Sequence, residues 1–218
     1  MRDVYHGQLR QLSLELSGLC GRSAEAMTKA ARALLGGDLV IAEQVISEDG
    51  ELGWAHGEFE RTACSLLALQ APVAGELRAV VGMIEVAERV RRMGGLACHV
   101  AEAARRRHPY RAVPEPLERR FSEMGQIGVY IARQVRAGVE RPVAVDVGEL
   151  ERLDDRVNEL ETAVLSWACG EHAEVAAGVD VALLARYFER YADQGVGAAR
   201  KLHFVATGDR LRAGTASS

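Results

Sequence analysis

Apolar residues recur at alternating steps of three and four along most of the chain, which is the spacing of long helices that pack along one seam. The first seam comprises Leu9, Leu12, Leu16, Leu19, Ala26, Ala30 and Leu34. It ends at Gly36 and Gly37, where a left-handed helix cap costs little, and Asp38 is placed to cap a second helix. The second seam comprises Ile41, Val45, Asp49, Leu52, His56, Phe59, Ala63 and Leu66, so it includes two polar residues.

A third seam starts near Leu77 and carries Glu88 and Arg91 among its apolar members. We expect Pro72 in the first turn of this helix, where a missing backbone N–H does no harm. Three arginines at 105–107 end the helix, and their positive charge complements the negative end of the helix dipole. The first half of the chain therefore predicts three long helices.

Residues 108–116 hold three of the five prolines and form the clearest internal boundary. The helical pattern then restarts over about 117–139, 148–170 and 179–207. Residues 85–101 can also be laid over 183–199 without a gap, which indicates an internal repeat.

These patterns predict an all-α fold of six long helices. We expect two tandem antiparallel three-helix bundles related by a pseudo-two-fold axis, because a helix of ~30 residues needs neighbours along its whole seam. The predicted domains are a first repeat at 1–108, a linker at 109–116, a second repeat at 117–208 and a disordered tail at 209–218.

Composition narrows the function. The chain of 218 residues has 48% apolar residues, a net charge of −4 and a pI near 5.9, so it lacks the basic footprint of a nucleic-acid-binding protein. The N-terminus lacks the apolar core of a signal peptide, and no run approaches the ~20 apolar residues of a membrane span. We therefore expect a cytoplasmic protein without direct membrane insertion.

Motifs of common enzymes are absent from the sequence: it contains no HExxH, GxSxG, Walker or GxGxxG signature. Cys20, Cys64, Cys98 and Cys169 are too widely separated to suggest a thiolate zinc site, and we expect buried, reduced thiols. The sequence thus predicts that the protein is not an enzyme.

Two segments carry a family resemblance. The stretch LLALQAPVAGELR at 66–78 is similar to the LLxLQxPVAxDLR segment of the PhoU family, and ERYAD at 189–193 follows the family's third-helix motif ERxGDxxxN. The matching motif residues include Pro72, Glu76, Arg78 and Arg190, with Glu76 where aspartate is commoner. The resemblance covers about 4–208.

This resemblance implies a negative regulator of phosphate uptake and phosphate-starvation signalling, which affects transcription indirectly. A PhoU-like protein would act as an adaptor that contacts the phosphate sensor histidine kinase and the ATPase of the phosphate importer. These partners rest on the resemblance, and helical periodicity alone does not predict them. The resemblance also leads us to expect a homodimer.

The two repeats depart from the family motif in different ways. In the first repeat the motif's glutamate, aspartate and asparagine fall on Arg91, Gly95 and His99. In the second repeat Glu189 and Asp193 keep the acidic pair, but Gly197 stands where asparagine is usual. The first site is therefore predicted to be degenerate.

A metal site is predicted in the second repeat. Glu189 and Asp193 lie one helical turn apart, and aligning the repeats brings Asp154 opposite them, with Asp155 and Glu161 as further candidates. Oxygen ligands suit Mg²⁺, Mn²⁺, Ca²⁺ or ferric iron, and Zn²⁺ is a further candidate. The alternative is an ordinary surface network in which the acids pair with Arg186, Arg190 or Arg200.

In the first repeat, Asp49 and His56 share a seam with Glu88 and Arg91 on the next helix. We expect Arg91 to replace the cation and to form a bidentate pair with Asp49. The alternative is that the helices rotate these residues into solvent. A different function, a ferritin-like di-iron protein, would need Glu-x-x-His pairs on two helices, and the sequence has none.

Overall fold

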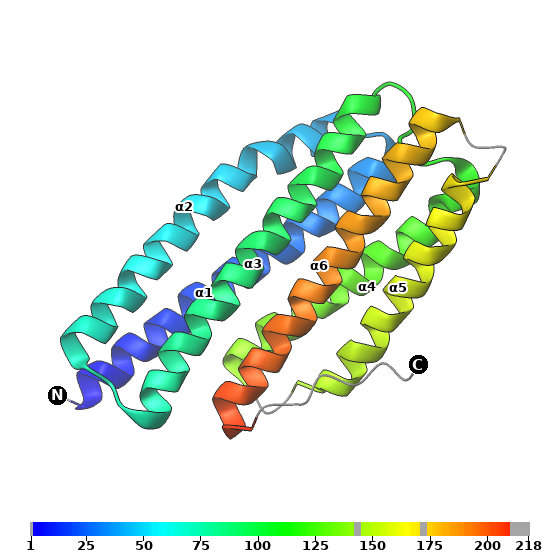
Figure 1. Cartoon of the computed structure of the whole chain (residues 1–218). Helices are drawn as coiled ribbons and strands as arrows, with labels where there is room; N and C mark the ends of the chain where they lie inside the picture. The colour runs from blue at the N-terminus through cyan, green and yellow to red at the C-terminus, as the bar shows by residue number, and fades with distance from the viewer. Residues whose placement is uncertain (1, 142–144, 171–173, 210–218) are drawn as a thin grey trace.

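Six long helices lie roughly side by side (Figure 1). The computed structural model describes residues 2–141, 145–170 and 174–209, and all regular secondary structure in these ranges is helical. The helices are α1 (Arg2–Gly36), α2 (Leu39–Gln70), α3 (Ala74–Arg107), α4 (Glu115–Glu140), α5 (Val147–Ala168) and α6 (Val175–Thr207). Met1 and residues 210–218, which make up most of the predicted tail, lie outside the described residues.

The helices form the two predicted three-helix bundles. Helices α1, α2 and α3 pack together in the first, and α4, α5 and α6 pack together in the second. The bundles join through α3 against α6 and through α1 against α4, so equivalent helices of the two repeats meet. Figure 1 shows α3 and α6 side by side in front of α1 and α4. This arrangement confirms the predicted all-α fold.

The helix ends follow local chemistry. Asp38 caps α2 by accepting a hydrogen bond from the backbone N–H of Ile41 at 3.0 Å, as predicted. Asp146 caps α5 in the same way, accepting from the N–H of Glu149 at 3.0 Å. Gly37 takes a φ of +66° after the last turn of α1, where the sequence predicts a left-handed cap.

Pro72 does not begin a helix, which corrects our prediction. Helix α2 continues to Gln70 and is ended by Ala71, whose φ is 42° and whose N–H donates to the carbonyl of Leu67. The residues around Pro72 form a short non-helical connection, and α3 begins only at Ala74. A proline ring disfavours right-handed helical backbone in the residue that precedes it. Helix α2 therefore ends before Pro72.

The prediction of four buried thiols is wrong for two of them. Cys20 is buried and Cys98 is partly buried, but Cys64 and Cys169 are exposed. Cys64 follows the buried Ala63 in α2, and adjacent helical residues point about 100° apart. Spacing along the helix therefore decides the burial of this cysteine, and residue type does not.

A continuous apolar core runs through both bundles. Its largest fully buried side chains include Tyr191, Phe59, Phe121, Phe188, Leu12, Leu16 and Met27. Each buried side chain of this size contributes about 1.5–3 kcal/mol relative to an exposed one. Tyr191 of α6 reaches into the first bundle, where its hydroxyl donates to the carbonyl of Ser23 at 3.1 Å. This buried hydrogen bond helps to set the relative position of the repeats.

Candidate functional site

The first-repeat residues meet between α2 and α3. Arg91 makes a bidentate pair with Asp49, with Nη1–Oδ1 at 2.8 Å and Nη2–Oδ2 at 3.1 Å. The side chains of Arg91 and Asp49 are 30% and 25% exposed, so the pair is half-buried. The bidentate pair expected from the sequence is present, and the two side chains are not fully rotated into solvent.

Two glycines lie close to the Arg91 guanidinium. A Cβ added at Gly53 would lie 3.5 Å from Nε of Arg91, and one at Gly95 would lie 3.7 Å from its Nη1. A Cβ added at Gly94 would instead lie 2.1 Å from Cδ2 of Leu52, so α2 and α3 approach closely there. The Arg91 side chain therefore lies against Gly53 and Gly95 with room for a methyl group, whereas Leu52 fills the space at Gly94.

His56 and Glu88 lie beside the Arg91 pair. His56 is only 8% exposed, and its Nε2 lies 3.7 Å from Oε2 of Glu88. Its Nδ1 lies 3.8 Å from Oε2 of Glu60, and the buried Nε2 has no hydrogen-bond partner. The imidazole is thus flanked by two carboxylates from α2 and α3.

The corresponding residues of the second repeat are mostly acidic. Burial, and then the negative charges of Asp193 and Glu189, raise the pKa of Asp154 to about 6. Burial also raises the pKa of Glu189, a shift that the Arg186 guanidinium opposes and Glu161 reinforces. The structure therefore brings Asp154, Glu189 and Asp193 close enough for their charges to interact strongly.

Arg186 forms ion pairs with two acids of the second repeat. Its Nη1 lies 2.9 Å from Oε2 of Glu189 and 3.6 Å from Oε1 of Glu161. The contact with Glu189 is an ion pair without hydrogen-bond alignment, because the same Oε2 atom is buried without a hydrogen-bond partner. Oδ1 of Asp154 is likewise buried and unpaired. Two buried carboxylate oxygens thus lack a hydrogen-bond partner, and of the two that of Glu189 is ion-paired with Arg186.

This donor set fits a hard cation in its chemistry. All the candidate ligands are carboxylate oxygens, and two of those oxygens are buried without a hydrogen-bond partner. Within the described ranges, however, no three His, Cys, Asp or Glu side chains already converge on one metal position. A bound cation would therefore need Arg186 to move away from Glu189, and the 51% exposure of the Arg186 side chain leaves it free to do so.

Two other candidates occupy different positions. Asp155 is exposed on α5, next to Asp154, and contributes to its raised pKa. Arg200 pairs with Glu151 at 2.8 Å and does not bind Glu189 or Asp193 within the described part of the chain. Among the described residues, the pairing with arginine that was the alternative to a metal site is therefore present through Arg186, which binds Glu189.

In the second repeat Gly197 stands where the family motif usually has asparagine, and the structure places a side chain beside it that the sequence did not suggest. A Cβ added at Gly197 would lie 2.4 Å from Nη1 of Arg89, which reaches across from α3. The same Nη1 donates to Oε1 of Gln194 at 3.3 Å. Arg89 therefore occupies the space beside Gly197, and only the unexpected glycine in the motif could have pointed to it.

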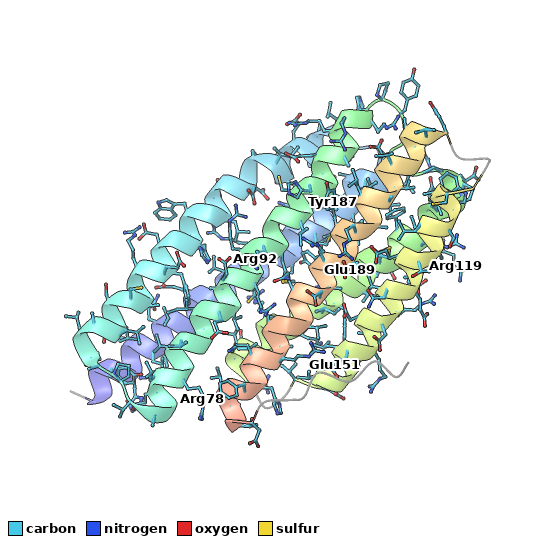
Figure 2. The ribbon with its side chains drawn as sticks, viewed as in Figure 1. Arg78, Arg92, Arg119, Glu151, Tyr187 and Glu189 are labelled. Atoms are coloured by element: carbon cyan, nitrogen blue, oxygen red, sulfur yellow. The ribbon has the colours of Figure 1, made fainter. Side chains whose placement is uncertain are left out.

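The family-motif residues do not form a single site. Arg78 lies near one end of the bundle, where its Nε donates to the carbonyl of Val205 at 3.3 Å and its guanidinium lies over the ring of Phe204 (Figure 2). Glu76 lies in the first turn of α3, where a negative charge favours the helix dipole. Pro72 lies in the connection before α3, whereas Arg190 lines the hollow between α3 and α6. Arg78 therefore joins the start of α3 to the end of α6.

Comparison with known proteins identifies the family. A model of the PhoU domain matches residues 16–104. Over 214 residues the chain is 42% identical to the phosphate-specific transport system accessory protein PhoU homolog 2 of Mycobacterium tuberculosis, with 95% of this chain and 99% of that protein covered. The chain belongs to the PhoU family. PhoU homolog 1 of Mycobacterium leprae is also 42% identical, with 95% of each chain covered.

Solved PhoU structures have the same fold. The PhoU crystal structure from Streptococcus pneumoniae superposes with a TM-score of 0.83 at 20% identity, covering 96% of this chain and all (100%) of that one. The PhoU crystal structure from Pseudomonas aeruginosa gives a TM-score of 0.84 at 16% identity, covering 94% and 100%. The six-helix architecture is thus the PhoU fold. No helix in the described ranges is long and apolar enough to cross a membrane.

Proposed function

We propose that this PhoU protein is a negative regulator of phosphate uptake and of phosphate-starvation signalling. It would act in the cytoplasm as an adaptor between the phosphate importer ATPase and the phosphate sensor histidine kinase, without catalysing a reaction. The observation that carries the proposal is the match along 95% of the chain to proteins named as phosphate transport accessory proteins. Long helical faces also suit an adaptor, since they offer grooves and ridges to helices of other proteins.

Deletion of the gene from cells grown in ample phosphate tests the regulatory role. We expect phosphate uptake and phosphate-starvation genes to become active, and a plasmid copy of the wild-type chain to silence them again. Mycobacterial relatives carry the names homolog 1 and homolog 2, so any second family member must be deleted as well. Unchanged expression in a strain with no remaining family member would contradict the proposal.

The adaptor role needs a separate experiment. We expect the purified chain to bind the importer ATPase and the cytoplasmic part of the sensor kinase in pull-down and calorimetric measurements. Light scattering of the purified chain at several concentrations tests the homodimer that we also propose. Absence of binding to both proteins would leave regulation without direct contact and overturn the adaptor role.

We further propose that the second repeat binds a divalent or ferric cation. The buried oxygens of Asp154 and Glu189 support this, because neither has a hydrogen-bond partner and a cation would compensate their negative charge. Candidate ions are Mg²⁺, Mn²⁺, Zn²⁺ and iron, and the carboxylate ligands favour the harder ones. An iron-oxidising, ferritin-like activity is the less supported alternative, and it predicts that the protein oxidises Fe²⁺ faster than buffer does.

Neutralising the acidic pair tests the cation site. Glu189→Gln with Asp193→Asn should lower bound metal in elemental analysis while leaving the helical circular dichroism unchanged, since the bundle core is apolar. Glu15→Gln with Glu51→Gln removes the same charge in the first repeat and should leave bound metal unchanged. Equal metal content in wild type and in the Glu189/Asp193 variant would remove the site.

A further inference from the structure

A groove lies between α1 and α4. It encloses about 440 Å³ and is lined by Thr28, Ala31, Arg32, Leu35, Ser122, Gly125, Gln126, Val129, Tyr130 and Arg133. Figure 1 shows that α1 and α4 form the layer behind α3 and α6. The two groove helices come from different repeats, so the groove exists only when the repeats are joined.

Small residues form the floor of the groove. A Cβ added at Gly125 would lie 3.1 Å from the Cβ of Ala31, so α1 and α4 approach closely at this point. Leu35 and Val129 are partly buried apolar side chains, and the ring of Tyr130 is 37% exposed. The Tyr130 hydroxyl donates to Oε1 of Glu149 at 3.1 Å, which holds the ring at the edge of the groove. The floor and one wall are therefore apolar and well positioned.

The rims of the groove are positively charged. Arg32 stands on α1 and Arg133 on α4, and no acidic residue lines the groove between them. Neither arginine forms an ion pair within the described part of the chain. The nearby acid Glu25 pairs with Lys29 at 3.0 Å. Two exposed guanidinium groups thus flank an apolar floor, and no carboxylate among the described residues forms an ion pair with either of them.

A third arginine lies farther along α4. The Nε of Arg136 donates to the hydroxyl of Ser17 at 3.3 Å, and its Nη1 would lie 3.2 Å from a Cβ added at Gly21 of α1. Arg133 and Arg136 are three residues apart and therefore lie on the same side of the helix. Glu140 accepts a hydrogen bond from the same Ser17 hydroxyl at 3.3 Å, so a carboxylate lies near Arg136 and the unpaired positive charge of the rim rests on Arg32 and Arg133.

We propose that the α1/α4 groove binds an acidic amphipathic helix of a partner protein. The apolar stripe of that helix would lie on Ala31 and Val129, and carboxylates on its two flanks would pair with Arg32 and Arg133. Helix-in-groove recognition uses this combination of apolar anchors and charged flanks. The inference goes beyond the proposed function, since it names the chemistry of the bound segment and holds for any protein that carries it.

Charge decides against a second copy of the chain as the occupant. A symmetric pair of subunits places the same surface patch on both sides of the interface. Two copies joined symmetrically through this groove would bring two positively charged patches together, and like charges close to one another are unfavourable. An acidic partner helix has no such conflict.

A designed peptide tests the proposal directly. The probe is a fluorescent helical peptide with leucines along one face and glutamates on both flanks, titrated with the full chain and followed by anisotropy. Its control replaces every glutamate with glutamine. We expect the acidic peptide to bind at least about tenfold more tightly than the control, with an affinity that falls as salt is added.

Charge reversal on the protein locates the binding site. Arg32→Glu with Arg133→Glu should weaken binding of the acidic peptide by about tenfold or more. Arg141→Glu with Arg152→Glu makes the same change in charge at other exposed arginines and should have little effect. All four positions are exposed, so these variants should fold, and circular dichroism verifies this.

Several results would overturn the proposal. Equal binding of the acidic and glutamine peptides would remove the role of charge, and equal loss in both double variants would place the peptide elsewhere. A wild-type dimer in sedimentation that Arg32→Glu with Arg133→Glu dissociates would make a second copy the occupant. Binding of the groove to anionic lipid vesicles in preference to the acidic peptide would make it a membrane-contact surface.

Discussion

The two repeats place opposite kinds of charge at equivalent positions. In repeat one, Arg91 of α3 binds Asp49 of α2, whereas in repeat two the corresponding Glu189 faces Asp154. A second exchange lies farther along α2 and α5, where His56 near Glu88 corresponds to Glu161 near Arg186.

The comparison distinguishes a carboxylate that is paired within the chain from carboxylates that are only partly paired. A guanidinium is permanently charged and is part of the chain, so repeat one carries its own counter-charge. Repeat two holds carboxylates that repel one another, and only Arg186 compensates Glu189 by an ion pair among the described residues. The same helical framework is therefore neutralised by a bidentate pair in the first repeat, whereas the second repeat leaves its carboxylates only partly compensated.

The largest effect should come from making repeat one resemble repeat two. Arg91→Glu with Gly95→Asp restores the family motif and sets new carboxylates beside Asp49. Without metal we expect a loss of about 2–3 kcal/mol in unfolding free energy, because the half-buried Asp49 loses its partner and gains like charges. Urea unfolding with chelator measures this loss.

Added metal then provides the control for that variant. Mn²⁺ should restore part of the lost stability, since an ion that binds only the folded state stabilises it. Adding Asp49→Ala should abolish the recovery. A double variant that neither loses stability nor responds to metal would show that the two repeats are not equivalent in this region.

Removing Arg91 alone should have the next largest effect. Arg91→Ala strands Asp49, and we expect a loss of about 1–2 kcal/mol because the pair is partly exposed and solvent supplies some compensation. Chelator should not reproduce this loss. Arg92→Ala is the matched control, since Arg92 is 63% exposed, and it should cost less than about 0.5 kcal/mol.

A double-mutant cycle with Asp49→Ala isolates the pair itself. We expect a coupling energy of about 1 kcal/mol between Arg91 and Asp49. A melting temperature of Arg91→Ala within about a degree of wild type would show that the bidentate pair contributes little to stability.

A smaller, pH-dependent effect is expected in repeat two. The pKa of Asp154 is about 6 in the folded chain against 3.8 ordinarily, so the folded state holds this proton more tightly. Stability from Asp154 is thus present at low pH and is lost as the pH rises from about 4 to about 6. Asp154→Asn should therefore stabilise the metal-free protein by about 1 kcal/mol at pH 7 and flatten this part of the pH profile.

The measurement is thermal unfolding in chelator across that pH range. Asp155→Asn is the control, because this neighbouring carboxylate is exposed, and it should leave the profile almost unchanged. If Asp154→Asn destabilises the protein at pH 7, the carboxylate has a stabilising partner and the comparison between repeats fails.

The smallest effect concerns the motif asparagine of repeat two. Gly197→Asn should change stability by less than about 1 kcal/mol, since the new side chain displaces only the flexible end of Arg89 and asparagine suits a helix better than glycine. Metal affinity should rise if the family asparagine contributes a ligand. Gly195→Ala is the contrast, because its Cβ would lie 2.4 Å from Cγ2 of the buried Ile131, and it should cost about 1–3 kcal/mol.

Much of the site follows from the sequence. Helical spacing predicts that Arg91 meets Asp49, because both residues fall on facing seams of a three-helix bundle, and aligning the repeats transfers this arrangement to the second repeat. The acidic group of Asp154, Glu189 and Asp193 follows from the same alignment. Periodicity works here because a helix of known pitch turns sequence spacing into a direction.

Other features depend on contacts between distant segments of the chain and could not be predicted from the sequence. Arg89 beside Gly197 joins the two repeats, and no pattern along either helix predicts how far a flexible arginine reaches across. The start of α3 differs from the prediction because proline tolerates both a first helical turn and the preceding connection. In the structure Ala71 has a positive φ and ends α2, so Pro72 lies in the connection before α3.

The sequence by itself determined six amphipathic helices, their duplication and the charge difference between the repeats, since all three are properties of residue order. Tertiary structure alone decided how deeply each charge is buried, and hence that Asp154 holds its proton to about pH 6 while Arg91 and Asp49 remain half-exposed. It also created the groove between α1 and α4, whose lining residues are far apart in the chain. Burial and cross-helix distance depend on how whole helices pack, and neighbouring residues along one helix do not specify them.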